Sequence, residues 1–142
     1  MDHTFTFMLL KSHMARRPFD CSHIWSQVRG YDLTPIGLMR LDLTPGLACR
    51  LYQEHEGRDY YARLLTSVTH DTVTVALVRG ENAVTRLRAL LGPTDPSTAS
   101  SDTIRGQFGS ALPDNVAHAS DSPEAALREA RLFYADTLIF KV

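Results

Sequence analysis

The segment Thr72 to Val78, with the sequence TVTVALV, decides the fold of this chain. Nearly every residue in it is β-branched or aliphatic, a composition that favours a buried strand. We therefore expect this strand to lie at the centre of a sheet. Asn82 then stands at an N-cap position and Gly92 with Pro93 supplies a stop signal, so we predict a helix from Ala83 to Leu91.

Two more strands and a helix are predicted on the N-terminal side of this segment. The stretch Thr4 to Leu10 (TFTFMLL) predicts a buried strand that ends at Lys11 and a basic loop. After Cys21, apolar residues recur at helical spacing up to Gly30, which stands where a left-handed C-terminal cap belongs. The apolar segment Leu33 to Leu43 predicts the second strand.

Two short helices are expected between the second strand and the central one. Thr44 is a good N-cap residue and Pro45 suits the first helical position, which predicts a helix that fades by Gly57. Another helix is expected from Asp59 to Leu65.

The C-terminal part completes the topology. Ser122 and Pro123 repeat the pattern of a helix start, and Thr137 to Val142 is predicted to be the last strand. The resulting order contains the split βαββαβ pattern, so we predict an α/β (α+β) protein with a ferredoxin-like antiparallel sheet and helices on one face. With no internal repeat and no linker, residues 1–142 are expected to form one domain.

Composition and charge restrict the function classes. The chain has 142 residues, 44% of them hydrophobic, and a formal net charge of -1. This balance argues against duplex nucleic acid or a membrane surface as a partner. No apolar run approaches the about 20 residues of a membrane-spanning helix, and the N-terminus lacks a secretion signal, so we expect a cytoplasmic protein. Cys21 and Cys49 form no CxxC motif, which predicts reduced thiols and no structural zinc.

Cationic residues gather around one long polar loop. Gly92 to Asp114 is long for a connection inside a compact domain, and such loops are usually functional or disordered. Lys11 at a strand end, Arg88 on the inward face of a helix and Arg105 in the loop lack matched core carboxylates, which favours an anion site. Each alone is typical of a solvated or snorkelling side chain, so only the combination points to function.

A short motif next to this loop carries a family resemblance. Asp114 to Ser122 (DNVAHASDS) resembles the Asn-x-x-His-Gly-Ser-Asp-Ser signature of nucleoside diphosphate kinases. The similarity continues without gaps from about Tyr52 to Phe133, and Thr6 to Lys11 resembles the first strand and lysine of the family.

The resemblance implies a phosphotransferase with a ping-pong mechanism. His118 would take the γ-phosphoryl group of a nucleoside triphosphate donor as a phosphohistidine and pass it to a nucleoside diphosphate acceptor. Glu129, with Ser120, would orient the imidazole, and Lys11 would assist catalysis. Imidazole suits this chemistry because one ring nitrogen can attack near neutral pH while the other donates to an acceptor that fixes the tautomer.

The resemblance also implies a set of substrate contacts. The phosphates would meet preplaced cations and donors, as phosphoryl transfer requires. Lys11 and the amide of Asn115 would contact the sugar, and the base would lie between an aromatic ring and an aliphatic wall. The phosphate contacts implied are Lys11, Tyr52, Arg88, Thr94 and Arg105, and the base contacts are Tyr60 and Leu112, with Leu64 nearby.

A metal ion and an assembly are implied as well. Mg²⁺ would be held mainly by the nucleotide phosphates, since it keeps much of its water, with Asp121 as a contact through water. Members of the family assemble as hexamers or tetramers, so we expect a homo-oligomer.

Several residues depart from the family pattern. Ser12 and His13 replace Pro-Asp after the lysine (KSH for KPD), and Ala119 replaces the glycine after the histidine (HASDS for HGSDS). Gly57 to Tyr61 replaces Asp-Arg-Pro-Phe-Phe, so the base pocket differs more than the phosphate pocket. Two alternatives therefore stand beside the kinase: a phosphotransferase for a modified nucleotide or another phosphate acceptor, and a non-catalytic nucleotide-binding homologue.

Overall fold

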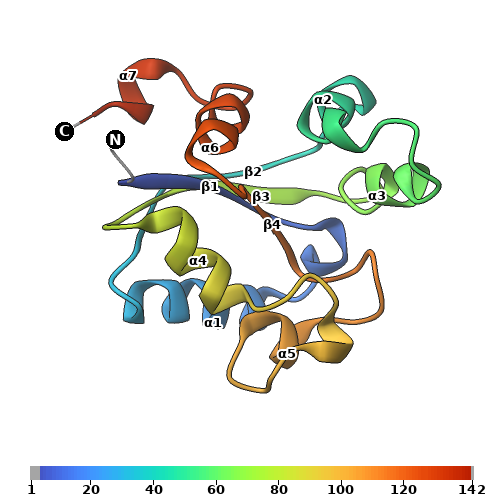
Figure 1. The fold of residues 1–142 in the computed structure, drawn as a ribbon, viewed down its shortest axis with the longest axis horizontal. Helices are drawn as coiled ribbons and strands as arrows, with labels where there is room; N and C mark the ends of the chain where they lie inside the picture. The colour runs from blue at the N-terminus through green and yellow to red at the C-terminus, as the bar shows by residue number, and fades with distance from the viewer. Residues whose placement is uncertain (1–3, 142) are drawn as a thin grey trace.

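A computed structural model describes residues 4–141, and its centre is a four-stranded antiparallel sheet in the order β2-β3-β1-β4 (Figure 1). The strands are β1 (Phe5–Leu10), β2 (Thr34–Leu41), β3 (Val73–Arg79) and β4 (Ala117–Ala119). The predicted central position of the TVTVALV segment is confirmed, because β3 pairs with β2 on one side and β1 on the other. The strand order is that of the predicted ferredoxin-like sheet.

Helices cover both faces of this sheet (Figure 1). Because side chains alternate along a strand, Met8 and Leu10 of β1 enter one core, and Phe7 and Leu9 enter the other. The helices on the first face are α1 (Pro18–Gly30) and α4 (Ala83–Leu91), with the short α5 (Ile104–Phe108) beside them. Those on the second are α2 (Pro45–Leu51), α3 (Tyr61–Thr66), α6 (Pro123–Ala130) and α7 (Asp136–Ile139). The prediction of helices on one face holds for the two helices of the βαββαβ pattern and is wrong for the others.

The predicted helix starts are mostly confirmed. Thr44 accepts a hydrogen bond from the Leu47 amide, and Ser122 accepts one from the Ala125 amide, so both act as N-caps. Asn82 precedes α4 as predicted, but in a left-handed conformation (φ 52°) and with no side-chain capping bond.

The start and end of α1 differ from the prediction. The helix begins at Pro18, inside the expected basic loop, where the proline lacks only a donor that a first turn leaves unpaired. Gly30 lies inside the helix, and the residue with positive φ is Asp32 (59°). Asp is among the few residues other than glycine that visit this region readily.

The prediction of a last strand at Thr137 to Val142 is wrong. Asp136–Ile139 form α7, and Arg79 donates to the carbonyl oxygens of Leu138 and Ile139 at 2.9 and 2.8 Å, which satisfies the end of that short helix. Val142 lies outside the described residues, as do residues 1–3, on which part of the expectation of no secretion signal rests. The fourth strand is instead β4, which contains His118.

In the part of the chain that the structure describes, none of the helices is long and apolar enough to cross a membrane.

Candidate active site

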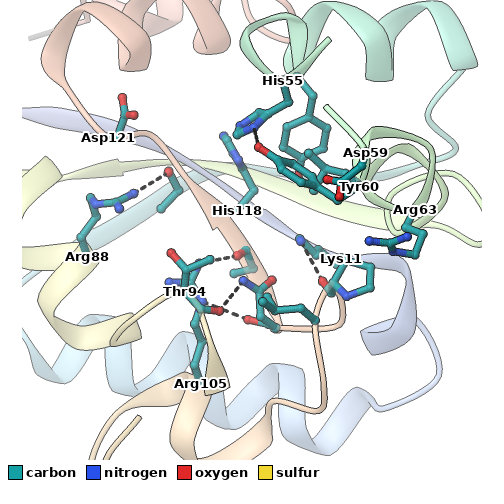
Figure 2. A pocket seen from close by; sticks show the side chains of 17 residues that line it. Lys11, His55, Asp59, Tyr60, Arg63, Arg88, Thr94, Arg105, His118 and Asp121 are labelled. Atoms are coloured by element: carbon teal, nitrogen blue, oxygen red, sulfur yellow. Dashed lines mark hydrogen bonds between the residues drawn. The ribbon is translucent and has the colours of Figure 1, made fainter. Parts of the chain in front are cut away.

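A cavity of about 630 Å³ opens beside β4. Its wall is made by the ends of β1 and β4, the side of α4, the region from α2 to α3 and the long loop after α4 (Figure 2). Every residue for which the sequence predicts a substrate or metal contact lines it: Lys11, Tyr52, Tyr60, Leu64, Arg88, Thr94, Arg105, Leu112, Asn115 and Asp121.

His118 lies at the centre of this cavity (Figure 2). It is the middle residue of β4 and pairs with Leu9 of β1, so its backbone is fixed by the sheet. The ring of Tyr52 meets the imidazole edge-on, with centroids 5.3 Å apart. Only 15% of the His118 side chain is exposed, and that portion faces the cavity.

Glu129 and Ser120 lie behind His118 and outside the cavity wall. Glu129 Oε1 is 2.6 Å from His118 Nε2 and accepts a hydrogen bond from Ser120 Oγ at 2.7 Å. Since a carboxylate only accepts, the neutral imidazole carries its proton on Nε2 and leaves the lone pair on Nδ1. Ser120 holds the shared carboxylate oxygen in place.

The charge of Glu129 is maintained although the side chain is 5% exposed. Burial alone would raise the pKa of Glu129, but the hydrogen bond and positive charge of His118, the Ser120 hydroxyl and Arg128 together lower it. Glu129 is therefore a carboxylate near neutral pH, and it stabilises positive charge on the imidazole.

Three cations surround the histidine: Lys11, Arg88 and Arg105. Arg105 is buried and donates to the carbonyl oxygens of Asn115, Gly92 and Ala117, which uses only part of the five N–H groups of a guanidinium. This network ties the long loop to β4.

Lys11 and Arg88 also use only some of their N–H groups in hydrogen bonds to the protein. Lys11 Nζ donates to the Pro113 carbonyl at 2.9 Å, and Arg88 donates to the Ala119 carbonyl at 3.2 Å. Burial and the nearby Arg105 lower the pKa of Lys11 to about 8, although Asp114 acts in the opposite direction. Burial and Arg88 lower the pKa of Arg105 to about 10. Burial is the main cause of both shifts and a neighbouring positive charge adds to each, so an anion in the cavity would stabilise both cations.

Two buried polar atoms in the cavity wall have no hydrogen-bond partner within the described residues. They are the hydroxyl oxygen of Tyr52 and Oδ1 of Asn115, whose amide nitrogen donates to the Thr94 carbonyl. A buried polar atom without a partner costs stability, so both are suited to binding a polar ligand. Burial and Glu129 raise the pKa of Tyr52, so it stays a neutral hydroxyl.

The opposite end of the cavity is aromatic and aliphatic, with Tyr60, Leu64 and Leu112. The Tyr60 hydroxyl is 2.6 Å from Nδ1 of His55, so the ring is held at its polar end (Figure 2). His55, Asp59 and Arg63 also line this end and were not among the predicted site residues. Their place beside Tyr60 follows from how the chain closes the cavity, so no local pattern in the sequence marks them.

The cavity offers a carboxylate that could contact a metal ion whose other ligands come from a bound nucleotide and water. Within residues 4–141 no group of three or more His, Cys, Asp or Glu side chains could hold a metal ion. Asp121 is exposed on the cavity rim between β4 and α6. One carboxylate fits Mg²⁺ bound mainly by phosphates and water.

The antiparallel sheet and the histidine among cations are those of a phosphotransferase, and the comparisons with known proteins agree. The chain belongs to the nucleoside diphosphate kinase family, whose model matches residues 4–139. The nucleoside diphosphate kinase of Methanocaldococcus jannaschii is 37% identical over 136 residues, which cover 95% of this chain and 96% of that protein. That of Kosmotoga olearia is 38% identical over 129 residues, covering 91% and 87% of the two chains.

Solved structures agree in fold. The Aquifex aeolicus nucleoside diphosphate kinase superposes with a TM-score of 0.87 at 27% identity, covering 94% of this chain and 96% of that one. The Halobacterium salinarum enzyme in complex with CDP superposes with a TM-score of 0.88 at 29% identity, covering 95% and 90%. The chain is thus a kinase of this family.

Proposed function

We propose that this chain moves the γ-phosphoryl group of a nucleoside triphosphate to a nucleoside diphosphate through a phosphohistidine at His118. The observation that carries the proposal is the hydrogen bond between His118 Nε2 and Glu129, because it leaves the Nδ1 lone pair free beside a cationic cavity. The names of the relatives support these substrates.

The first half-reaction consumes the donor. The Nδ1 lone pair forms a bond to the γ-phosphorus while the bond from that phosphorus to the bridging oxygen breaks, and a nucleoside diphosphate leaves with the electron pair. The positive charge that develops on the imidazole is stabilised by Glu129. Lys11, Arg88 and Arg105 stabilise the negative charge on the transferring group.

The second half-reaction reverses the first with another nucleotide. A terminal oxygen of the diphosphate attacks the same phosphorus, the N–P bond breaks, and His118 returns to its neutral form. One active site serves both halves, since donor and acceptor differ only by the transferred group.

The nucleoside would be held by its shape more than by its base edge. Asn115 and Lys11 would contact the sugar hydroxyls, and Tyr60 with Leu112 would sandwich the base. A π-face and an aliphatic wall hold any base, so we expect broad base tolerance. Mg²⁺ would enter bound to the nucleotide phosphates, with Asp121 contacting one of its waters.

We further propose a homo-oligomer, a hexamer or tetramer, that acts in the cytoplasm. Its support is the edge strand β2, on which Leu38 and Met39 are 44% and 38% exposed. An apolar edge strand is suited to pairing with another chain. Light scattering of the purified protein measures the assembly directly.

Intact-mass measurement after incubation with Mg·ATP and no acceptor tests the phosphotransfer. We expect one acid-labile phosphoryl adduct that His118→Ala abolishes and that exposed His23→Ala, the matched control, retains. Added nucleoside diphosphates should then discharge the adduct. If no adduct forms although ATP binds, the chain is a binding protein and the proposal is wrong.

A second candidate is a phosphotransferase for a different acceptor. The observation that favours it is the presence of polar groups beside the aromatic and aliphatic wall of the base end, where Asp59 and the hydrogen-bonded pair of Tyr60 and His55 line the cavity. An adduct that forms but discharges onto none of the common diphosphates supports this candidate against the first.

A further inference from the structure

The turn that leads into β4 is strained at one residue. Val116 has a φ of 78°, a region that β-branched residues rarely adopt. The Ala117 amide donates to the Asn115 carbonyl at 3.0 Å across it, which closes a three-residue turn. Such a conformation persists only when the surrounding contacts hold it.

Most of these contacts come from groups that do not titrate near neutral pH. The Lys11 amide donates to the Val116 carbonyl at 2.9 Å, and the Arg105 guanidinium donates to the Ala117 carbonyl at 2.7 Å. The Val116 amide is the exception, because it donates to Nε2 of His13 at 3.0 Å. Val116 is fully buried, so its amide depends on that imidazole.

The bond requires a neutral His13. An imidazole accepts a hydrogen bond only through a nitrogen without a proton, so the tautomer has its proton on Nδ1. A protonated imidazole has donors at both nitrogens, and it would face the Val116 N–H with a second N–H.

We propose that His13 is a positioning residue whose neutral imidazole holds the Val116 turn, and with it Asn115 and His118, so that its protonation disables the site. His13 is not in the cavity wall, so it acts through the turn rather than on the substrate. The kinetic consequence rests on the proposed phosphotransfer, whereas the bond itself does not.

The surroundings of His13 favour the neutral form. Burial lowers the pKa of His13, as do the positive charges of Arg17, Lys11 and His70, and Asp114 acts against them. These groups come from the residue that follows β1, the segment before α1, the turn before β3 and the long loop. The folded protein disfavours a proton on His13, so the pKa of His13 is lower in the folded chain than in the unfolded chain. The stabilisation of the turn by the His13–Val116 hydrogen bond is therefore complete above the unfolded pKa of about 6.5 and is lost as the pH falls through the lower folded pKa.

His13→Asp tests whether His13 acts by accepting the Val116 hydrogen bond or only by filling space, because a carboxylate accepts a hydrogen bond throughout the tested pH range. Asp is the residue of the family at this position, and its carboxylate accepts at every pH above its own pKa. As the pH falls from about 8 to about 5, kcat/KM of the unaltered protein should fall where His13 takes up its proton. His13→Asp should lack this fall and retain severalfold more of its neutral-pH kcat/KM at about pH 5.

Two further variants serve as controls for the pH profile. His13→Ala should be impaired at every pH, and His23→Asp on the exposed side of α1 should keep the original profile. Identical acid limbs for the unaltered protein and His13→Asp would overturn the proposal.

Nitrogen-15 NMR of the unaltered protein tests the bond without any variant or turnover. We expect the Nδ1–H tautomer of His13 near neutral pH, and a Val116 amide resonance that shifts with the same midpoint as the His13 ring. An Nε2–H tautomer, or a Val116 amide that ignores the titration, refutes the inference. If these resonances behave as expected but no phosphoryl adduct forms, only the proposed function has failed.

Discussion

At the scale of single residues, Glu129 orients His118 by a hydrogen bond and also stabilises its charge. Glu129→Gln separates the two effects, because the amide keeps the size and an acceptor but loses the charge. We expect kcat to fall by about 100-fold, since stabilisation of the imidazolium is lost in the transition state. The KM for nucleotides should stay within about twofold, because Glu129 lies outside the cavity wall.

Rapid-quench measurement of His118 phosphorylation checks this effect. Glu124→Gln, at an exposed position of the same helix α6, is the matched control and should leave the rate unchanged. A raised KM with unaltered kcat would mean that Glu129 acts in binding.

Lys11 gives the site an alkaline limit. Its pKa is lowered to about 8, with burial as the main cause and Arg105 as the second. As the pH rises through this value the free enzyme loses a cation, so kcat/KM should fall, approaching tenfold for each further pH unit. A bound nucleotide holds the proton on Lys11, so kcat should stay nearly constant over the same range.

Steady-state kinetics with ATP as the varied substrate measure both quantities. Lys11→Arg keeps the charge to far higher pH and should move the alkaline limb upward, whatever it costs in rate. If kcat/KM stays flat to about pH 10 in the unaltered protein, Lys11 is not the titrating cation.

At the scale of elements, strong local signals predicted the structure well. The β-branched segment before Arg79 is β3, and the apolar stripe that ends at Gly92 is α4. Thr44 and Ser122 start helices because their side chains bond the first free amides. These features depend on neighbours in the sequence, which is why the sequence alone reveals them.

Elements that depend on distant partners were missed. Ala117–Ala119 has little strand propensity, and it becomes β4 because it pairs with Met8 to Leu10 of β1. The apolar C-terminal residues form α7 instead of a strand, and Arg79, a distant residue at the end of β3, stabilises the end of that helix. For the same reason His55, Asp59 and Arg63 were absent from the predicted site, since their place beside Tyr60 follows from how the cavity closes.

The alanine that follows the histidine is compatible with the strand. Ala119 is in β4, pairs with Met8, is 6% exposed and is not among the residues with positive φ. Ala119→Gly should lower the free energy of unfolding by about 1 kcal/mol, because it frees the unfolded chain and removes a buried methyl group. The kcat/KM should change by less than about twofold, since the backbone needs no glycine here.

Urea unfolding and the phosphotransfer assay on one preparation measure the two effects. A gain in kcat/KM of about tenfold in Ala119→Gly would instead show that the methyl group obstructs transfer.

At the scale of the whole molecule, charge is distributed unevenly. The chain has a formal net charge of -1, yet Lys11, Arg88 and Arg105 converge on one cavity. Burial is the main cause that lowers the pKa of Lys11 and of Arg105, and a neighbouring guanidinium adds to each shift, so the folded protein holds these charges at a cost in stability. Sites that break the rule of paired buried charge are where function is expected.

This cost predicts that anions stabilise the entire fold. ADP at about 100 times its Kd should raise the free energy of unfolding by about 2.7 kcal/mol, which is roughly 10 °C in Tm for a chain of this size. Adenosine at the same concentration should have a much smaller effect, because it brings no charge to the cations. Arg88→Ala should reduce the shift with ADP, since Arg88 lines the phosphate end of the cavity and, among the described residues, its guanidinium donates only to the Ala119 carbonyl. Thermal unfolding with each ligand distinguishes the two ends of the cavity. Equal shifts with ADP and adenosine would mean that the base end carries the binding energy and that relief of cation repulsion contributes little.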